Sequence, residues 1–343
     1  MQQPLCITLG DPNGLGPELV CRLLDPDAGA AAPGIDNVSW VLVGPASSLE
    51  SHLGNRKPFW APIGSLDHID TLDPGVYLFE PEPLRGFSPE PGVASPEGGR
   101  AAGVSLAAAC DPLLSGKAGA VVTLPLNKAM LQAAGFDFPG HTEFLAQAAG
   151  LKPDEVTMHL CGDKLRVSLV TTHPRLADVP RLVTFERVLR CLTHTDGFLR
   201  ALGLEEGSRD IAVCGLNPHA GESGAIGTEE IEIIAPAIAE AQARGIDAFG
   251  PYPADTVFHR ALHGEFAAVV AMYHDQGLGP LKLMHFHEAV NVTLGLPFVR
   301  TSVDHGTGYD LVGKHTASTG SLEAAISLAS TLISQRNTPC TSE

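Results

Sequence analysis

The sequence lacks several features that mark specialised classes of protein. No stretch reaches the ~18 uninterrupted apolar residues of a membrane span, and the first residues, MQQPLCITLGDP, lack the basic and apolar regions of a signal peptide. Basic residues are few, because 22 Lys and Arg stand against 39 Asp and Glu, for a formal charge of −17. Surfaces that bind nucleic acid or anionic lipid have the opposite balance. We therefore expect a cytoplasmic protein that binds neither nucleic acid nor membrane.

Familiar short motifs are also missing. None of the seven cysteines belongs to a CxxC pair, and several lie in apolar runs, so we expect small buried thiols in a reducing compartment. Neither the GxGxxG dinucleotide fingerprint nor the GK[ST] phosphate loop is present. The glycine-rich segment at 10–18, GDPNGLGPE, is better explained as a tight turn with Pro17 at the start of a helix. Histidine, in contrast, is abundant, with 14 residues.

The order of apolar runs indicates the fold class. At ~100 to 200 residues per domain, 343 residues leave room for about two domains. Short apolar runs predict buried strands at 5–9, 40–43, 120–124, 167–171, 211–214, 267–272 and 290–294. Longer stretches predict helices at 101–114, 185–202, 228–244 and 321–333. This alternation predicts an α/β protein with largely parallel sheets. The segment 80–99, rich in Pro, Gly and Ser, predicts a surface loop.

Histidines follow three of the predicted strands directly. These are His173, His219 and His274, the last with Asp275 beside it. Ligands of open α/β sheets bind beyond the carboxyl ends of the strands. Three neutral imidazoles would bind a divalent metal and leave coordination positions open for substrate. From the pattern alone, it is equally possible that these three histidines are ordinary loop residues or helix caps.

Basic and hydroxyl residues lie close to other predicted strands and helices. In the segment PGHTE at 139–143, Thr142 is a candidate helix cap, and backbone N–H groups there would hold an anion. Lys282, Asn291 and Arg300 each lie near a predicted strand. In so acidic a chain, such a set beside a metal would suit a phosphate or carboxylate substrate. Surface charges with weak partners remain the alternative for any one of them.

These segments together resemble the 4-hydroxythreonine-4-phosphate dehydrogenase family (PdxA) of vitamin B6 biosynthesis. The resemblance runs nearly end to end. It rests on these segments, in order: GDPNGLGPE at 10–18, TLPLNK at 123–128, PGHTEF at 139–144, TTH at 171–173, CGLNPHAGESGAIGTEE at 214–230, GPYPADT at 250–256, YHDQG at 273–277 and VNVTLGLPFVRTSVDHGTG at 290–308.

The resemblance implies roles for particular residues. It makes His173, His219 and His274 the metal ligands. The substrate-binding residues that it implies are His141, Thr142, Lys282, Asn291 and Arg300. Candidates for the general base, by residue type and position only, are Lys128, Asp255 and Asp275.

The resemblance also implies an architecture. The fold is expected to be similar to that of isocitrate and isopropylmalate dehydrogenases, with two α/β/α domains and an active site in the cleft between them. We assign 1–135 plus 290–343 to the first domain and 136–289 to the second. A homodimer is implied in which both subunits contribute ligands to each metal.

A cofactor site is expected near the C-terminal part of the chain. In the similar dehydrogenases a loop there holds the adenosine half of the cofactor. The loop that looks like it here contains Asp304, His305, Gly306, Thr307, Gly308, Tyr309 and Asp310. NAD or NADP is therefore expected on this loop, and the sequence leaves the choice between them open.

The activity implied is NAD(P)- and metal-dependent oxidation of 4-phosphooxy-L-threonine at C3, followed by decarboxylation to 3-amino-2-oxopropyl phosphate. A sister activity on 4-phosphothreonate or 4-phosphoerythronate, in sugar-acid catabolism, would leave almost the same motifs. A metal-dependent phosphohydrolase or a phosphate-binding protein is the alternative from another class. Three imidazoles favour Zn, Co or Ni, although an oxygen-rich substrate would allow Mg or Mn.

Overall fold

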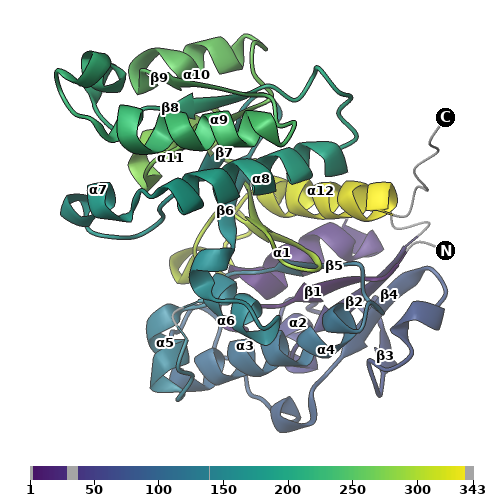
Figure 1. Cartoon of the computed structure of the whole chain (residues 1–343). Helices are drawn as coiled ribbons and strands as arrows, with labels where there is room; N and C mark the ends of the chain where they lie inside the picture. The colour runs from purple at the N-terminus through teal and green to yellow at the C-terminus, as the bar shows by residue number, and fades with distance from the viewer. Residues whose placement is uncertain (1–2, 29–37, 139, 337–343) are drawn as a thin grey trace, which may run out of the picture. The chain divides into compact units, whose positions relative to one another are not determined.

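The structure is a computed structural model that describes residues 3–28, 38–138 and 140–336. The chain divides into two compact units: 1–153 with 296–343, and 154–295. Each unit is an α/β domain with a largely parallel sheet, as the sequence predicts (Figure 1). No helix among the described residues is long and apolar enough to cross a membrane.

The sheet of the first unit is parallel throughout, in the order β3-β4-β2-β1-β5-β12. Its strands are β1 (Leu5–Thr8), β2 (Ser39–Val43), β3 (Ala61–Ile63), β4 (Gly75–Phe79), β5 (Ala120–Thr123) and β12 (Val299–Val303). Its helices are α1 (Leu15–Leu24), α2 (Ala46–Glu50), α3 (Pro96–Ala108), α4 (Cys110–Leu114), α5 (Lys128–Ala133), α6 (His141–Ala148) and α12 (Gly320–Arg336). Helix α3 packs on β1 and β2, and α12 packs on β5 and β12.

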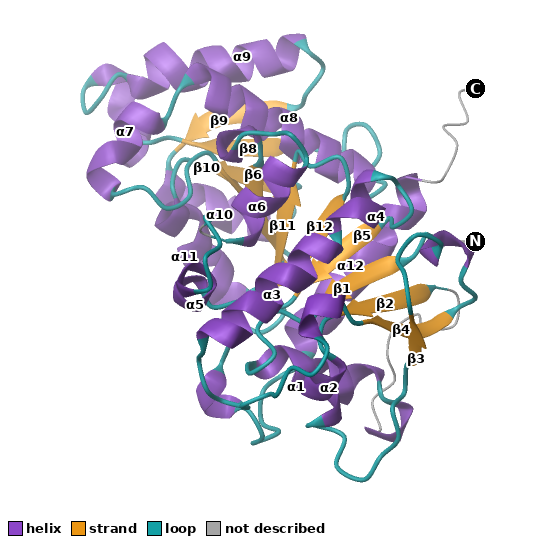
Figure 2. Cartoon of the chain, turned by 90° about the horizontal axis from the view of Figure 1, so that it is seen from below, coloured by secondary structure: helices purple, strands orange, loops and turns teal. Residues whose placement is uncertain are grey.

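The sheet of the second unit has the order β11-β6-β7-β10-β8-β9, and only β6 runs antiparallel to its neighbours. Its strands are β6 (Thr157–Cys161), β7 (Arg166–Leu169), β8 (Ile211–Cys214), β9 (Ala248–Tyr252), β10 (Ala268–Ala271) and β11 (Val290–Leu294). Its helices are α7 (Val179–Leu182), α8 (Phe185–Ala201), α9 (Ala235–Ala243), α10 (Ala254–Leu262) and α11 (His274–Met284). Figure 2 distinguishes these strands from the helices that cover them.

In the second unit, successive side chains of a strand contact helices on opposite faces of the sheet. Val167 and Leu169 of β7 pack in one apolar cluster with side chains of β8, β10, α10 and α11. Ser168, between them, faces the other way and accepts a hydrogen bond from Thr195 of α8 at 2.7 Å. Because successive side chains of a strand point to opposite faces, both sides of this sheet are covered.

The limits of the two units differ from the expected ones. Residues 136–153 join the first unit, because the rings of Phe136, Phe138 and Phe144 form a chain of contacts with centroids 5.4 and 4.4 Å apart. Phe136 in turn packs against Gly103 of α3, where a Cβ atom would lie 2.4 Å from the ring. Residues 290–294 join the second unit, because β11 pairs with β6.

All seven strands expected from the apolar runs are present, but five others were not predicted: β3, β4, β6, β9 and β12. Strand β12 was missed because Arg300, Thr301 and Ser302 interrupt its apolar pattern, although all three are buried. The predicted loop at 80–99 is too long, since α3 begins at Pro96. Ser95 caps that helix by accepting a hydrogen bond from the Gly98 N–H at 3.1 Å.

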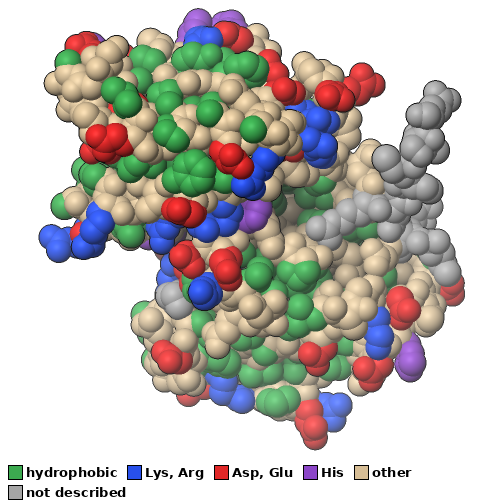
Figure 3. All heavy atoms as spheres, viewed as in Figure 1, with side chains coloured by type: hydrophobic (Ala, Val, Ile, Leu, Met, Phe, Trp, Pro, Cys, Tyr) green, Lys and Arg blue, Asp and Glu red, His purple; other side chains and the backbone are tan. Residues whose placement is uncertain are grey.

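The six cysteines among the described residues are free and buried, as expected, and burial raises the pKa of each thiol. Cys340 lies outside the described residues. Acidic side chains are interspersed with basic and uncharged ones on the face drawn in Figure 3.

One histidine of the second unit belongs to the core. His159 of β6 is fully buried, its Nδ1 lies 2.8 Å from the Ser168 hydroxyl, and its ring centroid lies 4.4 Å from that of Phe198. Burial, with a smaller contribution from Arg166, lowers the pKa of His159 to about 3. This imidazole is therefore neutral at neutral pH.

We expect His159 to make the fold acid-sensitive. Its folded-state pKa lies below the ordinary value near 6.5, so its contribution to stability is complete above pH 6.5 and is lost as pH falls toward 3. His159→Phe should therefore reduce the pH dependence of the free energy of unfolding by about 1.4 kcal/mol per pH unit between pH 6 and 4. Urea unfolding at several pH values measures this, with the exposed His68→Phe as control. A slope equal to that of the wild type would contradict it.

Candidate active site

Two of the predicted metal ligands lie side by side in the second unit. His173 follows β7, and His274 is the first residue of α11, directly after β10. Because β7 and β10 are parallel neighbours, their carboxyl ends meet at one edge. The ring centroids of the two histidines are 5.3 Å apart, and both rings line a cavity of about 390 Å³. Strand order thus brings together residues that are 101 positions apart in the sequence.

His219 lies in a turn with an unusual backbone. The five residues 219–223 all have left-handed φ angles, between 44° and 77°, and only Gly221 among them is glycine. The left-handed conformation costs a non-glycine residue about 1–2 kcal/mol. Such a turn persists only where surrounding contacts impose it.

A buried carboxylate holds the backbone that leads into this turn. Glu230 accepts hydrogen bonds from the backbone N–H groups of Leu216 and Asn217 at 2.8 and 2.7 Å, and from the Asn217 side chain at 3.0 Å. Its carboxylate also fills the space beside Gly221, where a Cβ atom would lie 2.6 Å from Oε2. Asn217 donates to Glu229 as well, at 2.7 Å, and the pKa of that carboxyl is lowered by hydrogen bonds.

The donor chemistry at these histidines fits a divalent metal. Nδ1 of His274 lies 2.7 Å from Asp275, and Nδ1 of His219 lies 2.7 Å from Glu222. A carboxylate on one ring nitrogen leaves the other nitrogen as the metal ligand. Within the described part of this chain no three His, Cys, Asp or Glu side chains are placed to hold one ion. The structure therefore groups His173 with His274, and the inclusion of His219 stays a prediction.

A cluster of basic residues lies in the first unit. Arg300 of β12 is 3% exposed, and its Nη2 and Nε donate to the Thr123 hydroxyl at 2.8 and 3.2 Å. Burial lowers the pKa of Arg300 to about 10, which the charge of Glu143 partly opposes. The guanidinium is therefore still charged at neutral pH.

His141 remains neutral in this cluster. Burial, followed by the charges of Arg300 and Lys128, holds the pKa of His141 well below its ordinary value, while a hydrogen bond with the Leu124 backbone opposes the shift. Lys128 opens α5, whose N-cap residue Asn127 accepts from two backbone N–H groups at 3.0 and 3.2 Å. The cluster thus combines two cations with an uncharged imidazole, which is a setting for an anion.

Thr142 does not cap its helix. Helix α6 begins at His141 after Gly140, whose extended backbone (φ 176°) makes it the N-cap residue, so Thr142 lies inside the first turn. The expected cap was therefore placed two residues too late. Thr142 stays a candidate substrate-binding residue by its position beside His141.

The other predicted residues lie in the second unit, apart from the cofactor loop. Lys282 is half-buried in the last turn of α11, and Asn291 lies on β11 opposite Leu160, with its Oδ1 buried and without a hydrogen-bond partner. Asp255 lies in the first turn of α10 and is exposed, as is Asp275. The substrate-binding role of Lys282 and Asn291 and the base assignment stay predictions, as does a site between the two domains.

The expected cofactor loop is held by the glycine-rich turn at 10–18. The Leu15 N–H donates to the Thr307 carbonyl at 2.8 Å, and the Tyr309 hydroxyl donates to Asp11 at 2.6 Å. Burial raises the pKa of both Asp11 and Tyr309. Gly308 (φ 54°) permits the close approach, since a Cβ atom there would lie 2.3 Å from Leu15. The segment is the predicted tight turn, and its helix α1 begins at Leu15.

Sequence reasoning missed several residues of these clusters. Thr123 ends β5 and holds Arg300, so the strand-end rule applied to the histidines would have found it. Glu143 lies within a motif that resembles the family but was given no role. Glu230 lies 11 residues beyond His219, and only the fold shows that it holds that turn.

Comparisons with known proteins agree with one another. The family model described as pyridoxal phosphate biosynthetic protein PdxA matches residues 43–329. A 4-hydroxythreonine-4-phosphate dehydrogenase of Geobacter metallireducens is 44% identical over 342 residues, covering 95% of this chain and 94% of that protein. A putative D-threonate 4-phosphate dehydrogenase of Bradyrhizobium diazoefficiens is 40% identical, with 96% of each covered. The crystal structure of the Klebsiella pneumoniae 4-hydroxythreonine-4-phosphate dehydrogenase matches with a TM-score of 0.82 at 37% identity, covering 97% and 98%.

We expect Glu230 to control the left-handed turn. Glu230→Gln replaces an acceptor oxygen by an amide that cannot accept the Asn217 side-chain N–H, and loss of a charged hydrogen bond costs about 1.5–3 kcal/mol. The amides of Leu216 and Asn217 should then exchange with deuterium faster than in the wild type. Glu232→Gln, at an exposed position of the same helical turn, is the control. Unchanged exchange in Glu230→Gln would show that other contacts hold the turn.

Proposed function

This chain belongs to the PdxA family, and on that premise we propose that it oxidises 4-phosphooxy-L-threonine at C3 with NAD or NADP in pyridoxal 5'-phosphate biosynthesis. The product loses its carboxylate as CO2 and becomes 3-amino-2-oxopropyl phosphate. The observation that carries the proposal is the basic cluster of buried Arg300, exposed Lys128 and neutral His141 in a chain of formal charge −17. A cytoplasmic location stays part of the proposal.

The basic cluster suits the phosphate of this substrate. Arg300 offers a charged, planar donor set that its two hydrogen bonds to Thr123 hold in one orientation. His141, being uncharged, lies beside these cations without adding a charge that would need a counter-ion of its own. We assign Thr142, Lys282 and Asn291 to the remaining polar groups of the substrate.

The histidines suit a divalent metal beside the C3 hydroxyl. His173, His219 and His274 would hold the ion, with Asp275 and Glu222 each orienting one of these rings. When bound, such a metal supplies positive charge where negative charge develops on the substrate oxygens. Zn, Co, Mg and Mn all stay compatible with the proposal.

The reaction balances as a hydride transfer followed by loss of CO2. The C3 hydroxyl loses its proton to a base, and the C3–H bond breaks with its electron pair going to the nicotinamide, so NAD(P)⁺ becomes NAD(P)H. The resulting β-keto acid then breaks its C1–C2 bond, and the electron pair stays on the substrate as an enolate that is protonated. Lys128, Asp255 and Asp275 remain the candidates for the base.

The rival substrate carries a hydroxyl at C2 in place of the amine. The relative from Bradyrhizobium diazoefficiens, named a putative D-threonate 4-phosphate dehydrogenase, favours this reading at 40% identity. The two substrates share the phosphate, the C3 hydroxyl and the carboxylate. The basic cluster and the histidines described above suit both equally.

The deciding assay offers both substrates side by side, with NAD and with NADP, and follows reduced cofactor by absorbance. We expect the amino substrate to have the higher kcat/KM. A higher kcat/KM for 4-phosphothreonate or 4-phosphoerythronate would establish the sister activity. Release of inorganic phosphate without cofactor reduction would establish a phosphohydrolase and overturn both.

We expect Arg300→Ala to weaken binding of the phosphorylated substrate much more than binding of NAD(P). A charged hydrogen bond lost in a buried site costs about 1.5–3 kcal/mol, or roughly 10- to 150-fold in affinity. The KM of the phosphorylated substrate should rise by such a factor, whereas that of NAD(P) should change little. Arg300→Lys, which keeps the charge but not the two bonds to Thr123, should be intermediate. Equal losses for substrate and cofactor would mean that the cluster does not bind the phosphate.

We expect each of His173→Ala, His219→Ala and His274→Ala to lose the metal, measured by metal content, and most of the turnover. If a homodimer shares its sites, one subunit supplies two ligands of a site and the other subunit the third. Mixing the variants in pairs should then restore about a quarter of wild-type activity in two of the three mixtures, because half of the dimers are hybrids with one intact site.

Hybrid dimers must be confirmed by mass before the activities are compared. The mixture that fails identifies the two histidines that come from the same subunit. Failure of all three mixtures, with hybrids present, would show that the sites are not shared between subunits.

A further inference from the structure

Helix α1 carries a buried carboxylate that the proposed reaction does not use. Glu18 ends the motif GDPNGLGPE, and it is fully buried. A charge without solvent is retained only where partners compensate it. Among the described residues, Glu18 forms its hydrogen bond and ion pairs with α1 itself and with the C-terminal loop, which we define as residues 304–319 between β12 and α12.

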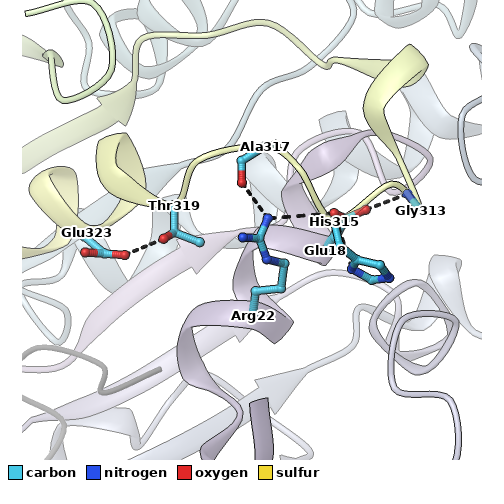
Figure 4. Close-up of polar contacts among 7 residues, drawn as sticks. All are labelled: Glu18, Arg22, Gly313, His315, Ala317, Thr319 and Glu323. Carbon is cyan, nitrogen blue, oxygen red and sulfur yellow. Dashed lines mark hydrogen bonds and ion pairs between the residues drawn. The ribbon is translucent and has the colours of Figure 1, made fainter. Parts of the chain in front are cut away.

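The contacts of Glu18 join these two segments (Figure 4). Its Oε2 accepts a hydrogen bond from the Gly313 N–H at 2.6 Å. Its Oε1 lies 3.7 Å from Nδ1 of His315 and 4.0 Å from Nη1 of Arg22, one helical turn along α1. Arg22 Nη1 also donates to the Ala317 carbonyl at 2.5 Å. Glu18 and Arg22 thus contact three residues of the C-terminal loop.

The part of the loop that Glu18 contacts has an unusual backbone conformation. Gly313 and His315 both adopt left-handed φ angles, 77° and 54°. Beyond them, Thr319 donates its hydroxyl to Glu323 in the first turn of α12. Glu18 therefore fixes a bend between a helix that is firmly packed on the sheet and the preceding residues 304–310.

Residues 304–310 are the proposed cofactor loop. The same motif contacts them through Leu15 and Asp11, which bind Thr307 and Tyr309. One short segment of α1 and its preceding turn thus contacts the C-terminal loop from Thr307 to Ala317. Within this set Glu18 contacts residues 313 and 315, and Arg22 is the cation of α1 that pairs with it.

We propose that Glu18 is a positioning residue for the cofactor: through Gly313 and His315 it sets the conformation of the C-terminal loop that receives the adenosine half of NAD(P). This inference rests on the proposed cofactor loop. On this proposal the glycine-rich motif at 10–18 supports a loop that is distant in sequence and does not bind phosphate itself.

The test is the affinity of Glu18→Gln for reduced cofactor. Glutamine keeps the volume and one acceptor oxygen, but it removes the charge that faces Arg22 and His315. Titration with NADH and with NADPH, followed by fluorescence, gives Kd for the tighter of the two. We expect Kd to rise about tenfold or more, the factor that corresponds to a lost charged hydrogen bond. The KM of the phosphorylated substrate and kcat at saturating cofactor should stay within twofold.

Asp25→Asn is the matched control. Asp25 follows the last residue of α1, is 1% exposed, and forms its ion pair with Arg56 at 2.9 Å, not with a residue of the C-terminal loop. It should lower stability without changing the Kd for cofactor. An equal change of Kd in both variants, or an equal change for substrate and cofactor in Glu18→Gln, would show a general structural role and overturn the proposal.

A variant of the loop itself separates this inference from the proposed function. Asp310→Asn, on the exposed part of the loop, should weaken cofactor binding if the loop is the cofactor site. If Asp310→Asn has an effect and Glu18→Gln has none, the inference is wrong and the site stands. If Asp310→Asn has no effect, the cofactor loop itself is misassigned.

If Glu18→Gln does not fold, a second variant tests the same proposal. Arg22→Gln removes the bond to the Ala317 carbonyl at a partly exposed position. It should raise Kd for the reduced cofactor in the same direction, again without a matching change in the KM of the substrate. An unchanged Kd would contradict the proposal.

Discussion

The chemistry of this protein depends on where parallel strands end. Neighbouring parallel strands direct their carboxyl ends to the same edge, so residues distant in sequence meet there without any local motif. His173 and His274 meet in this way after β7 and β10. In the first unit, Thr123 at the end of β5 binds the side chain of Arg300, which lies opposite Val121 near the beginning of the parallel neighbour β12. Both clusters follow from strand order.

Strand order does not determine the conformation of the irregular segments. Buried charged side chains hold the backbone of two of these segments. Glu230 binds the backbone that leads into the left-handed turn of His219, and Glu18 binds the bend that follows the proposed cofactor loop. Glu230 accepts two backbone N–H groups at 2.8 and 2.7 Å, and Glu18 accepts one at 2.6 Å, so each carboxylate restricts the backbone that it binds.

Much of this could be predicted from residues alone, and the failures have physical causes. Apolar runs predicted β1, β5 and β10 because their buried positions are filled by hydrophobic side chains. The same rule missed β12, where buried Arg300, Thr301 and Ser302 are compensated by hydrogen bonds that no local pattern shows.

Contacts across the fold were equally hidden from the sequence. The pairing of Glu18 with Gly313 spans 295 positions, and nothing in GDPNGLGPE indicates it. The cap expected at Thr142 was wrong because the conformation of Gly140, which decides where α6 begins, depends on tertiary context. Strand-end residues were thus predictable, whereas the residues that support them were not.

In the proposed reaction, this chain transfers hydride from C3 of a phosphorylated four-carbon acid to a nicotinamide. The most direct test uses substrate deuterated at C3 with unlabelled NAD(P), followed by mass spectrometry of the cofactor and of released CO2. We predict that one deuterium appears in each reduced cofactor and that CO2 forms with the same stoichiometry. Deuterium retained in the phosphorylated product or lost to water would contradict the account.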